Sequence, residues 1–112
     1  MVVVGFPHDE GVRRNGGRVG AAGGPACVRK FLPKMGAVVN PERGVDLRQA
    51  LDLYDAGDVG VGEPLEAAHE ALRALVAEIV GKGLIPFVIG GGNDQSYPNA
   101  AGALDALADR DG

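Results

Sequence analysis

Polar side chains that could bind a metal or a substrate occur in three places, each at the end of an apolar run. These side chains are His8, Asp9 and Glu10, then Asp55 and Asp58, and finally Asn93 and Asp94 after three glycines. Carboxylate oxygens and imidazole are ligands that suit hard divalent ions such as Mn²⁺. The residue types therefore predict a hard-metal or polar-substrate site, if the fold brings the three places together.

The intervening segments predict an α/β fold that would do so. Short apolar runs indicate strands, and apolar side chains at helical spacing indicate helices. Along the chain we expect a strand at 2–6, a polar loop at 7–24, a short helix from 25 that ends at 33–36, a strand at 51–55, a helix at 64–82, a strand at 84–89 and a helix at 100–110. Strands that alternate with helices form parallel sheets, and their carboxyl ends share one edge. Residues 37–48 fit no single element.

The helix predicted at 64–82 has the clearest pattern. One stripe of this helix carries the apolar residues Leu65, Ala68, Leu72, Leu75, Val76, Ile79 and Val80. A stripe of this kind faces a core. His69 falls inside it, which favours a partly buried structural histidine over a ligand. Cys27 lies next to Val28 in the shorter helix and is predicted to be a small core residue.

Composition excludes several classes of protein. With 112 residues the chain has the length of one domain, and its net charge of −4 offers no basic surface for nucleic acid. Cys27 is the single cysteine and has no disulfide partner, and no apolar run approaches the ~20 residues of a membrane span. We expect a cytoplasmic protein without nucleic-acid or membrane partners. Because the chain opens inside a strand and stops after a helix, we also expect a fragment of a longer protein.

The three consecutive glycines do not form a nucleotide-binding loop. After Gly90, Gly91 and Gly92, the dinucleotide fingerprint needs a further glycine where this chain has Gln95. No Gly-Lys-Ser or Gly-Lys-Thr follows either. The glycines therefore indicate a sharp turn after a strand, where the backbone approaches a ligand closely.

A basic cluster lies in the loop predicted at 7–24. Its members are Arg13, Arg14, Asn15 and Arg18. Guanidinium groups bind carboxylates through two parallel hydrogen bonds, so the cluster could hold an acidic substrate. A solvated basic loop explains the same residues equally well.

Several segments carry longer motifs in a fixed order. They are Gly5-Phe6-Pro7, the run Asp9-Glu10-Gly11-Val12-Arg13-Arg14-Asn15-Gly16-Gly17-Arg18-Val19-Gly20-Ala21, Gly24-Pro25, Val28-Arg29, Tyr54-Asp55-Ala56-Gly57-Asp58-Val59 and Pro86-Phe87-Val88-Ile89-Gly90-Gly91-Gly92. Together they resemble the N-terminal part of the ureohydrolases, the family of arginase, agmatinase and formimidoylglutamase. They are most similar to the formimidoylglutamase branch. The resemblance implies that residues 1–112 are the N-terminal portion of one arginase-like domain, a three-layer α/β/α fold with a parallel sheet.

The resemblance also implies an activity. Ureohydrolases hold two Mn²⁺ ions per subunit and hydrolyse a C–N bond of a linear amidine or guanidino compound. In the formimidoylglutamase branch, N-formimidoylglutamate gives glutamate and formamide in histidine breakdown. The family commonly forms homo-oligomers, such as trimers or hexamers. By this resemblance Asn15 and Arg18 would hold the substrate's carboxylates, and Asp94 and Asp58 would support the site.

One position departs from the family pattern. Asn93 stands directly after the glycines, where the family places its first metal-ligating histidine, and a neutral amide oxygen is a weaker ligand than imidazole for such a metal. Three interpretations follow. The chain belongs to an active hydrolase, to a catalytically inactive structural or regulatory subunit, or to a stand-alone binding domain in which residues 1–112 unfold cooperatively by themselves.

Overall fold

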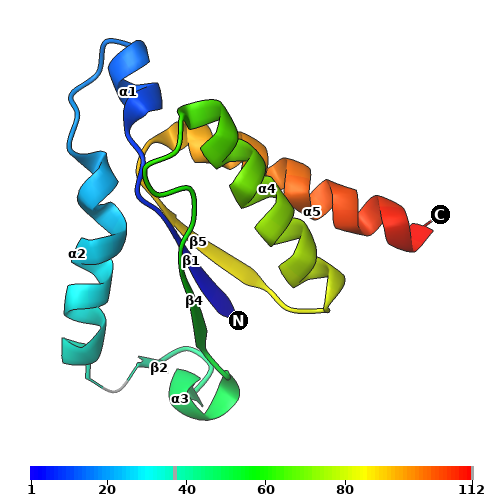
Figure 1. The fold of residues 1–112 in the computed structure, drawn as a ribbon. Coiled ribbons are helices and arrows are strands. Elements are labelled where there is room, and N and C mark those ends of the chain that lie inside the picture. Colours follow the sequence, from blue (N-terminus) through cyan, green and yellow to red (C-terminus); the bar gives the residue numbers. More distant parts are fainter. Residues whose placement is uncertain (37, 112) are drawn as a thin grey trace.

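The computed structural model describes residues 1–36 and 38–111 and has three layers (Figure 1). A parallel sheet with strand order β4-β1-β5 forms the middle layer. Helices α4 and α5 lie on one side of the sheet and α2 lies on the other. The bounds are β1 Val2–Phe6, α2 Gly24–Phe31, β4 Tyr54–Asp58, α4 Leu65–Gly81, β5 Pro86–Gly90 and α5 Ser96–Asp111. This is the predicted three-layer α/β/α arrangement.

Strand β1 is the centre of the sheet, and every residue in it is buried. Val2 pairs with Tyr54 of β4 on one side and with Pro86 of β5 on the other. The ladder with β5 is regular, whereas the ladder with β4 shifts between Val3 and Gly5. Alternate side chains of a strand face opposite sides of a sheet. On the α4 side they meet the helix stripe in one core, made of Val2, Val4, Phe6, Leu65, Ala68, Leu72, Val76 and Ile79. The strand at 2–6 and the apolar stripe of the long helix are therefore confirmed.

The segment predicted as a polar loop at 7–24 contains more structure than its composition indicated. Helix α1 spans Glu10–Arg14, and a 3₁₀ turn spans Ala21–Gly23. Glu10 accepts hydrogen bonds from Arg13 and Arg14, which lie three and four residues later on the same helical face. The prediction of a structureless loop was wrong. Helix α1 buries no residue and is stabilised by local ion pairs, so its sequence lacks the apolar periodicity that would have indicated a helix.

The middle strand is displaced from its predicted position. The apolar run predicted a strand at 51–55, whereas β4 spans Tyr54–Asp58. Pairing with β1 decides the register, since Tyr54 N–H donates to the carbonyl of Met1 at 3.0 Å. Asp55 thus lies within the strand and Asp58 ends it. The apolar Leu51 and Leu53 lie before the strand and face a groove.

The segment 38–50, which had no clear pattern, forms a small subdomain. Strands β2 (Val39–Asn40) and β3 (Val45–Asp46) form an antiparallel hairpin, and the one-turn helix α3 (Leu47–Ala50) follows. The Asp46 carboxylate accepts the Arg48 backbone N–H at 3.0 Å and so caps α3.

The prediction that Cys27 is a core residue was wrong, because Cys27 is exposed. The buried residue of α2 is Pro25, and Val28 one turn later lines the sheet side of the helix. Cys27 is about 200° around the helix from Pro25 at ~100° per residue. It therefore points away from the sheet.

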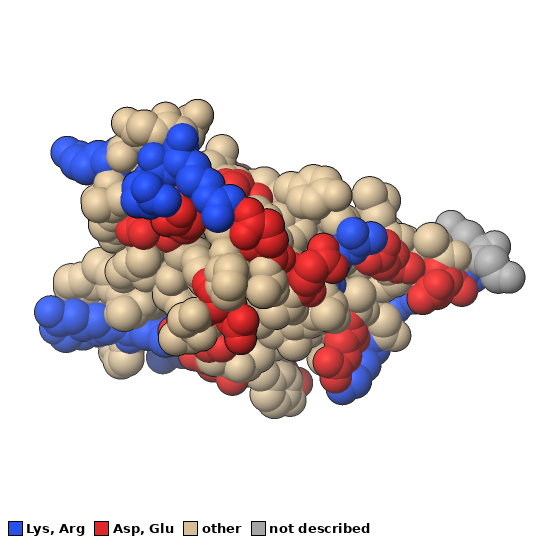
Figure 2. Space-filling model, turned by 45° about the horizontal axis from the view of Figure 1, so that its top comes forward, with Lys and Arg blue, Asp and Glu red and all other residues tan. Residues whose placement is uncertain are grey.

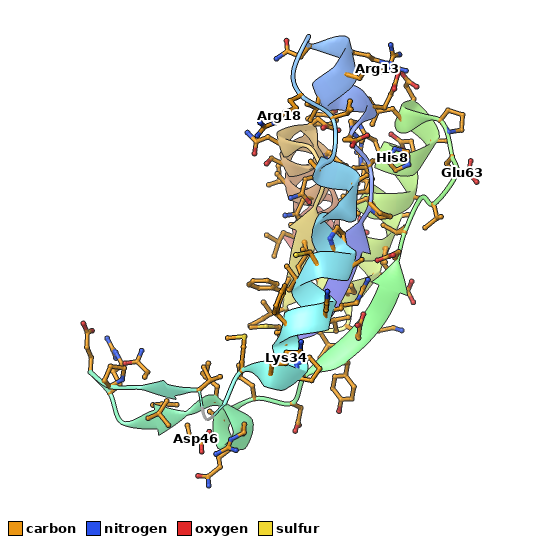
Figure 3. The ribbon with its side chains drawn as sticks, turned by 90° about the vertical axis from the view of Figure 1, so that its left-hand side faces the viewer. His8, Arg13, Arg18, Lys34, Asp46 and Glu63 are labelled. Atoms are coloured by element: carbon orange, nitrogen blue, oxygen red, sulfur yellow. The ribbon has the colours of Figure 1, made fainter. Side chains whose placement is uncertain are left out.

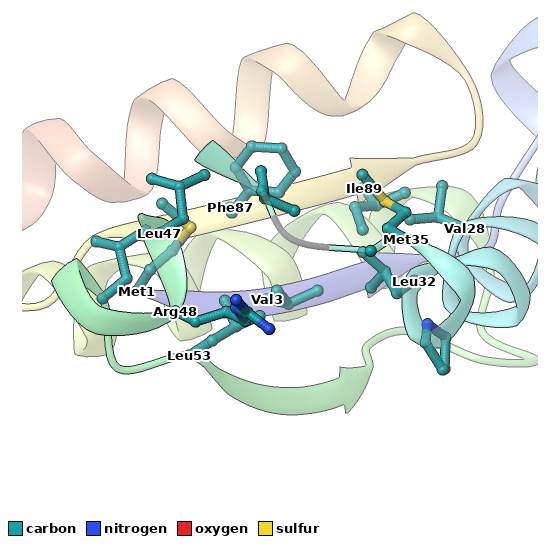
Figure 4. A pocket seen from close by; sticks show the side chains of 14 residues that line it. Met1, Val3, Val28, Leu32, Met35, Leu47, Arg48, Leu53, Phe87 and Ile89 are labelled. Atoms are coloured by element: carbon teal, nitrogen blue, oxygen red, sulfur yellow. The ribbon is translucent and has the colours of Figure 1, made fainter. Parts of the chain in front are cut away.

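The α2 side of the sheet is only partly covered. A groove of about 600 Å³ lies between α2, the sheet and α3 (Figure 4). Its lining is almost entirely apolar and includes Val3, Leu32, Leu53, Phe87 and Ile89. Among the described helices, none is long and apolar enough to cross a membrane.

Candidate functional site

A small pocket lies at the carboxyl edge of the sheet. It has a volume of about 290 Å³ and is lined by Gly11, Val12, Asn15, Gly17, Asn93 and Asp94. The first four residues belong to the chain that follows β1, and the last two follow β5. Because β1 and β5 are adjacent and parallel, with Phe6 paired to Gly90, the segments that follow them emerge side by side. The fold thus brings the loop after β1 beside Asn93 and Asp94, although His8, Asp9 and Glu10 themselves do not line the pocket.

The glycine turn is bonded directly to the end of β1. Gly91 N–H donates to the carbonyl of Phe6 at 3.2 Å, and Gly92 N–H donates to the carbonyl of His8 at 2.8 Å. A Cβ at position 91 would overlap the His8 carbonyl oxygen and lie 2.8 Å from the Phe6 oxygen. Only glycine allows the two backbones to approach so closely. The three glycines therefore place Asn93 beside the loop that follows β1.

Asp94, the residue after Asn93, is bonded to α4. His69 Nε2 lies 2.6 Å from Asp94 Oδ2, and both side chains are about three-quarters buried, with 22% and 24% exposed. The other oxygen, Oδ1, faces Gly11, where a Cβ would come within 2.5 Å. The predicted structural role of His69 fits this burial, but its partner is a residue of the pocket.

His8 does not line the pocket. Its Nε2 lies 2.7 Å from the carbonyl oxygen of Gly60 in the loop after β4, and its ring stacks on Phe6 with centroids 5.2 Å apart. The ring of His69 also packs on Phe6, with centroids 5.8 Å apart. Phe6 is completely buried. His8 therefore ties the β4 loop to the core.

Asp9 fixes the loop that carries Asn15. Its Oδ2 accepts the backbone N–H of Gly20 at 2.7 Å and that of Ala22 at 3.2 Å. These two donors hold the pKa of Asp9 below its usual value, Gly20 most strongly. The carboxylate thus closes the loop between α1 and the 3₁₀ turn.

Two of the three loop arginines are engaged by acids. Arg13 Nε donates to Glu10 at 2.7 Å, and Arg14 bonds both Glu10 and Glu66 of α4. The hydrogen bond from Arg13, and then that from Arg14, lowers the pKa of Glu10 to about 2. Figure 2 accordingly shows basic and acidic side chains in contact over the α1 end of the molecule. The cluster is therefore not a bare basic patch.

Arg18 differs from the other two arginines. It is exposed, it does not line the pocket, and it forms no ion pair with the part of the chain that the structure describes. In the view of Figure 3 it lies on the outer side of the loop between α1 and α2, across that loop from His8. Asn15 and Arg18 thus share a loop, but of the two only Asn15 borders the pocket.

The remaining polar place, Asp55 and Asp58, bonds to α2. Arg29 donates to both oxygens of Asp55 at 2.9 Å and also bonds Asp58. The pKa of Arg29 is raised by these carboxylates, Asp55 first, and that of Asp55 is lowered mainly by Arg29. Asp58 does not line the pocket. The two carboxylates join β4 to α2.

The described residues do not by themselves fit a metal centre. Within 1–36 and 38–111, no three His, Cys, Asp or Glu side chains lie close enough together to hold an ion. Asn93 is exposed at the pocket and offers one amide oxygen. The sequence missed the pairing of His69 with Asp94, because the two residues are 25 positions apart on different elements and no periodicity connects them.

This fold and the motifs at the glycine turn define a family. The sequence model of the Arginase family matches residues 1–111, so the chain belongs to the arginase family. It is 44% identical over 108 residues to a formimidoylglutamase of Klebsiella pneumoniae, which covers 96% of this chain and 31% of the relative. It is 40% identical to that of Chromobacterium violaceum over 98% of this chain and 33% of the relative. The chain therefore spans about a third of the length of these relatives.

Solved structures agree with the sequence comparison. The chain superposes on Trypanosoma cruzi formiminoglutamase with Mn²⁺ at a TM-score of 0.86 and 53% identity, over 95% of this chain and 35% of the other. An asparagine-to-histidine variant of the same protein with Mn²⁺ gives the same TM-score. A putative agmatinase from Clostridium difficile gives 0.78 at 25% identity, over 96% of this chain and 37% of that one.

Proposed function

We propose that this chain contributes to a manganese-dependent hydrolase that cleaves a non-peptide C–N bond in a linear amidine. The substrate that fits best is N-formimidoylglutamate, which gives glutamate and formamide. One observation carries the proposal. The pocket joins Asn15 to Asn93 and Asp94 in a chain that is 53% identical to a formiminoglutamase over 95% of its length.

Within that site, Asn93 would supply one oxygen donor to the metal centre. The remaining ligands would come from residues outside 1–112, since the described residues contain no group of three suitable side chains. Two Mn²⁺ ions at that centre would acidify a water molecule and would stabilise charge on the oxygen and nitrogen atoms bonded to the reacting carbon. The part played by the described residues is to place Asn93 through the glycine turn.

An asparagine at this position is compatible with metal binding in the T. cruzi relative, if Asn93 corresponds to the asparagine of its variant. That relative has structures with Mn²⁺ both as formiminoglutamase and as the asparagine-to-histidine variant. We propose this correspondence. It favours an active hydrolase over a catalytically inactive subunit, the alternative that the missing histidine raises.

The loop between α1 and the 3₁₀ turn would recognise the substrate's carboxylates. Asn15 borders the pocket and can donate an amide N–H. Arg18 is exposed on the same loop without an ion-pair partner among the described residues, whereas Arg13 and Arg14 are neutralised by acids. A guanidinium without an internal partner remains available to bind a carboxylate.

Hydrolysis by the full natural chain tests the proposal. Glutamate and formamide release from N-formimidoyl-L-glutamate is measured at saturating Mn²⁺, with agmatine and arginine as competing candidates and metal content measured in parallel. We expect turnover of the formimidoyl substrate and loss of turnover on chelation. Less than one Mn²⁺ per subunit together with no hydrolysis of any of the three would support the inactive subunit instead.

A further inference from the structure

The side chain of Asn93 depends on its turn for its position. Asn93 begins a 3₁₀ turn that spans Asn93–Gln95, and its side chain is exposed at the pocket with no hydrogen bond to the described residues. A side chain without an internal partner is oriented only by its backbone and neighbours. Whatever fixes this turn therefore fixes the donor that Asn93 presents.

The backbone hydrogen bonds that join the turn to the rest of the fold lie at its start. Gly91 and Gly92 bond the carbonyls of Phe6 and His8, and Gln95 N–H donates to Gly92 at a long 3.3 Å. These bonds secure the start of the turn. Beyond Gly92, the bond between Asp94 and His69 is the first hydrogen bond from the turn to another element among the described residues.

That contact comes from a histidine that the helix holds in place. His69 lies on the apolar stripe of α4, between Leu65 and Leu72 at helical spacing, and its ring packs on the buried Phe6. Its Nε2 reaches Asp94 Oδ2 at 2.6 Å. An imidazole three-quarters buried in an apolar stripe costs free energy unless its polar nitrogens are bonded, and Asp94 supplies the bond at Nε2.

The space around Asp94 is shaped to receive its side chain. Gly11 in α1 and Gly92 in the turn both face Asp94 Oδ1, and a Cβ at either position would collide with the carboxylate. The carboxylate is thus enclosed by His69 on one oxygen and by two glycine backbones on the other. Rotation of Asp94 would break the bond to His69 or meet the backbone of α1.

We propose that His69 is a positioning residue for the pocket: through its hydrogen bond to Asp94 it anchors the 93–95 turn to α4 and so fixes Asn93. The inference rests on the proposed function only in that Asn93 is the residue whose position matters. The anchoring itself is a property of the fold and can be measured without activity.

The test compares His69→Leu, His69→Gln and wild type in the full natural chain. Leucine preserves the apolar stripe but removes the donor, whereas the glutamine amide can replace Nε2. Arg73→Met is the matched control, because Arg73 also links α4 to α5. It bonds the two oxygens of Asp105 at 2.7 and 3.0 Å, and neither residue lines the pocket. Hydrogen exchange of the peptide that contains residues 91–95 is the first measurement, and Mn²⁺ affinity is the second.

We expect exchange in residues 91–95 to accelerate in His69→Leu and to return toward wild type in His69→Gln. Mn²⁺ affinity should fall roughly tenfold in His69→Leu, the lower end of the loss seen when a residue that orients a metal ligand is removed. Arg73→Met should leave both quantities unchanged. Unchanged exchange at 91–95 in a folded His69→Leu protein would overturn the inference, and so would equal acceleration in Arg73→Met. If no variant binds Mn²⁺ or turns over substrate, the proposed function fails while the exchange result still decides the role of His69.

Discussion

Because Gly91 approaches β1 closely, adding a single methyl group at this position should lower the free energy of unfolding substantially. In Gly91→Ala the new Cβ would overlap the His8 carbonyl oxygen and lie within 2.8 Å of the Phe6 oxygen. Both obstacles are backbone atoms of the central strand and its continuation, so neither can rotate away. The glycine turn must therefore separate from the end of β1.

That separation has a definite magnitude. It removes two hydrogen bonds, from Gly91 to Phe6 and from Gly92 to His8, each worth about 1 kcal/mol. Overpacking adds roughly 1–3 kcal/mol for the shifts that remain. The free energy of unfolding should thus fall by about 3–5 kcal/mol, a decrease in Tm on the order of 10 °C for a domain of ordinary size.

The assay is urea and thermal unfolding of the full natural chain, with Gly81→Ala as the control. Gly81 is the last residue of α4, and a Cβ there meets no atom within 4 Å. The same chemical change should leave that variant neutral or stabilise it by about 0.5–1 kcal/mol. If Gly91→Ala unfolded within about 1 kcal/mol of wild type, the close approach of the two backbones would not be what requires glycine.

Three further predictions concern the core, the loop and the pocket. Leu72→Ala should lower the free energy of unfolding by about 2–5 kcal/mol, because Leu72 is completely buried between α4 and the sheet; a loss below 1 kcal/mol in urea unfolding would contradict that packing. The Glu10 carboxylate should titrate near pH 2 by NMR, and Arg13→Gln should move the midpoint of that titration up toward 4.5. Because the pKa of Glu10 in the folded protein lies below its usual value, the stability that this carboxylate contributes is complete above pH 4.5 and is lost as the pH falls toward 2. Asn93→His should raise Mn²⁺ affinity because imidazole is the stronger ligand, and equal metal content at limiting Mn²⁺ in both proteins would argue against a metal at this position.

The sequence predicted best the elements whose own apolar pattern is enough to identify them. Strand β1 is buried on both faces, so three consecutive valines mark it without ambiguity. Helix α4 buries one stripe for 17 residues, and that length makes its period plain. Strand β4 begins later than predicted, because its pairing with β1 sets where it begins and its own apolar content does not.

The site divides in the same way. The sequence predicted that Asn15 and Asn93 belong to functional segments, and the pocket brings both together. The supporting role that the family resemblance gives Asp58 stays a prediction, and in the structure this carboxylate bonds Arg29 and does not line the pocket. Which acid meets which base depends on the order β4-β1-β5, which puts the loops after β1 and β5 side by side.

By itself, then, the sequence determined the fold class, the family and the residue that follows the glycine turn, because these depend on local pattern and on residue identity. Tertiary structure alone decided the partners. His69 reaches Asp94, Arg29 reaches Asp55, and Gly91 meets Phe6, in each case across elements that are far apart along the chain. Such contacts leave no trace in a local pattern, since hydrogen-bond geometry of about 3 Å is set only when the sheet and its helices have packed.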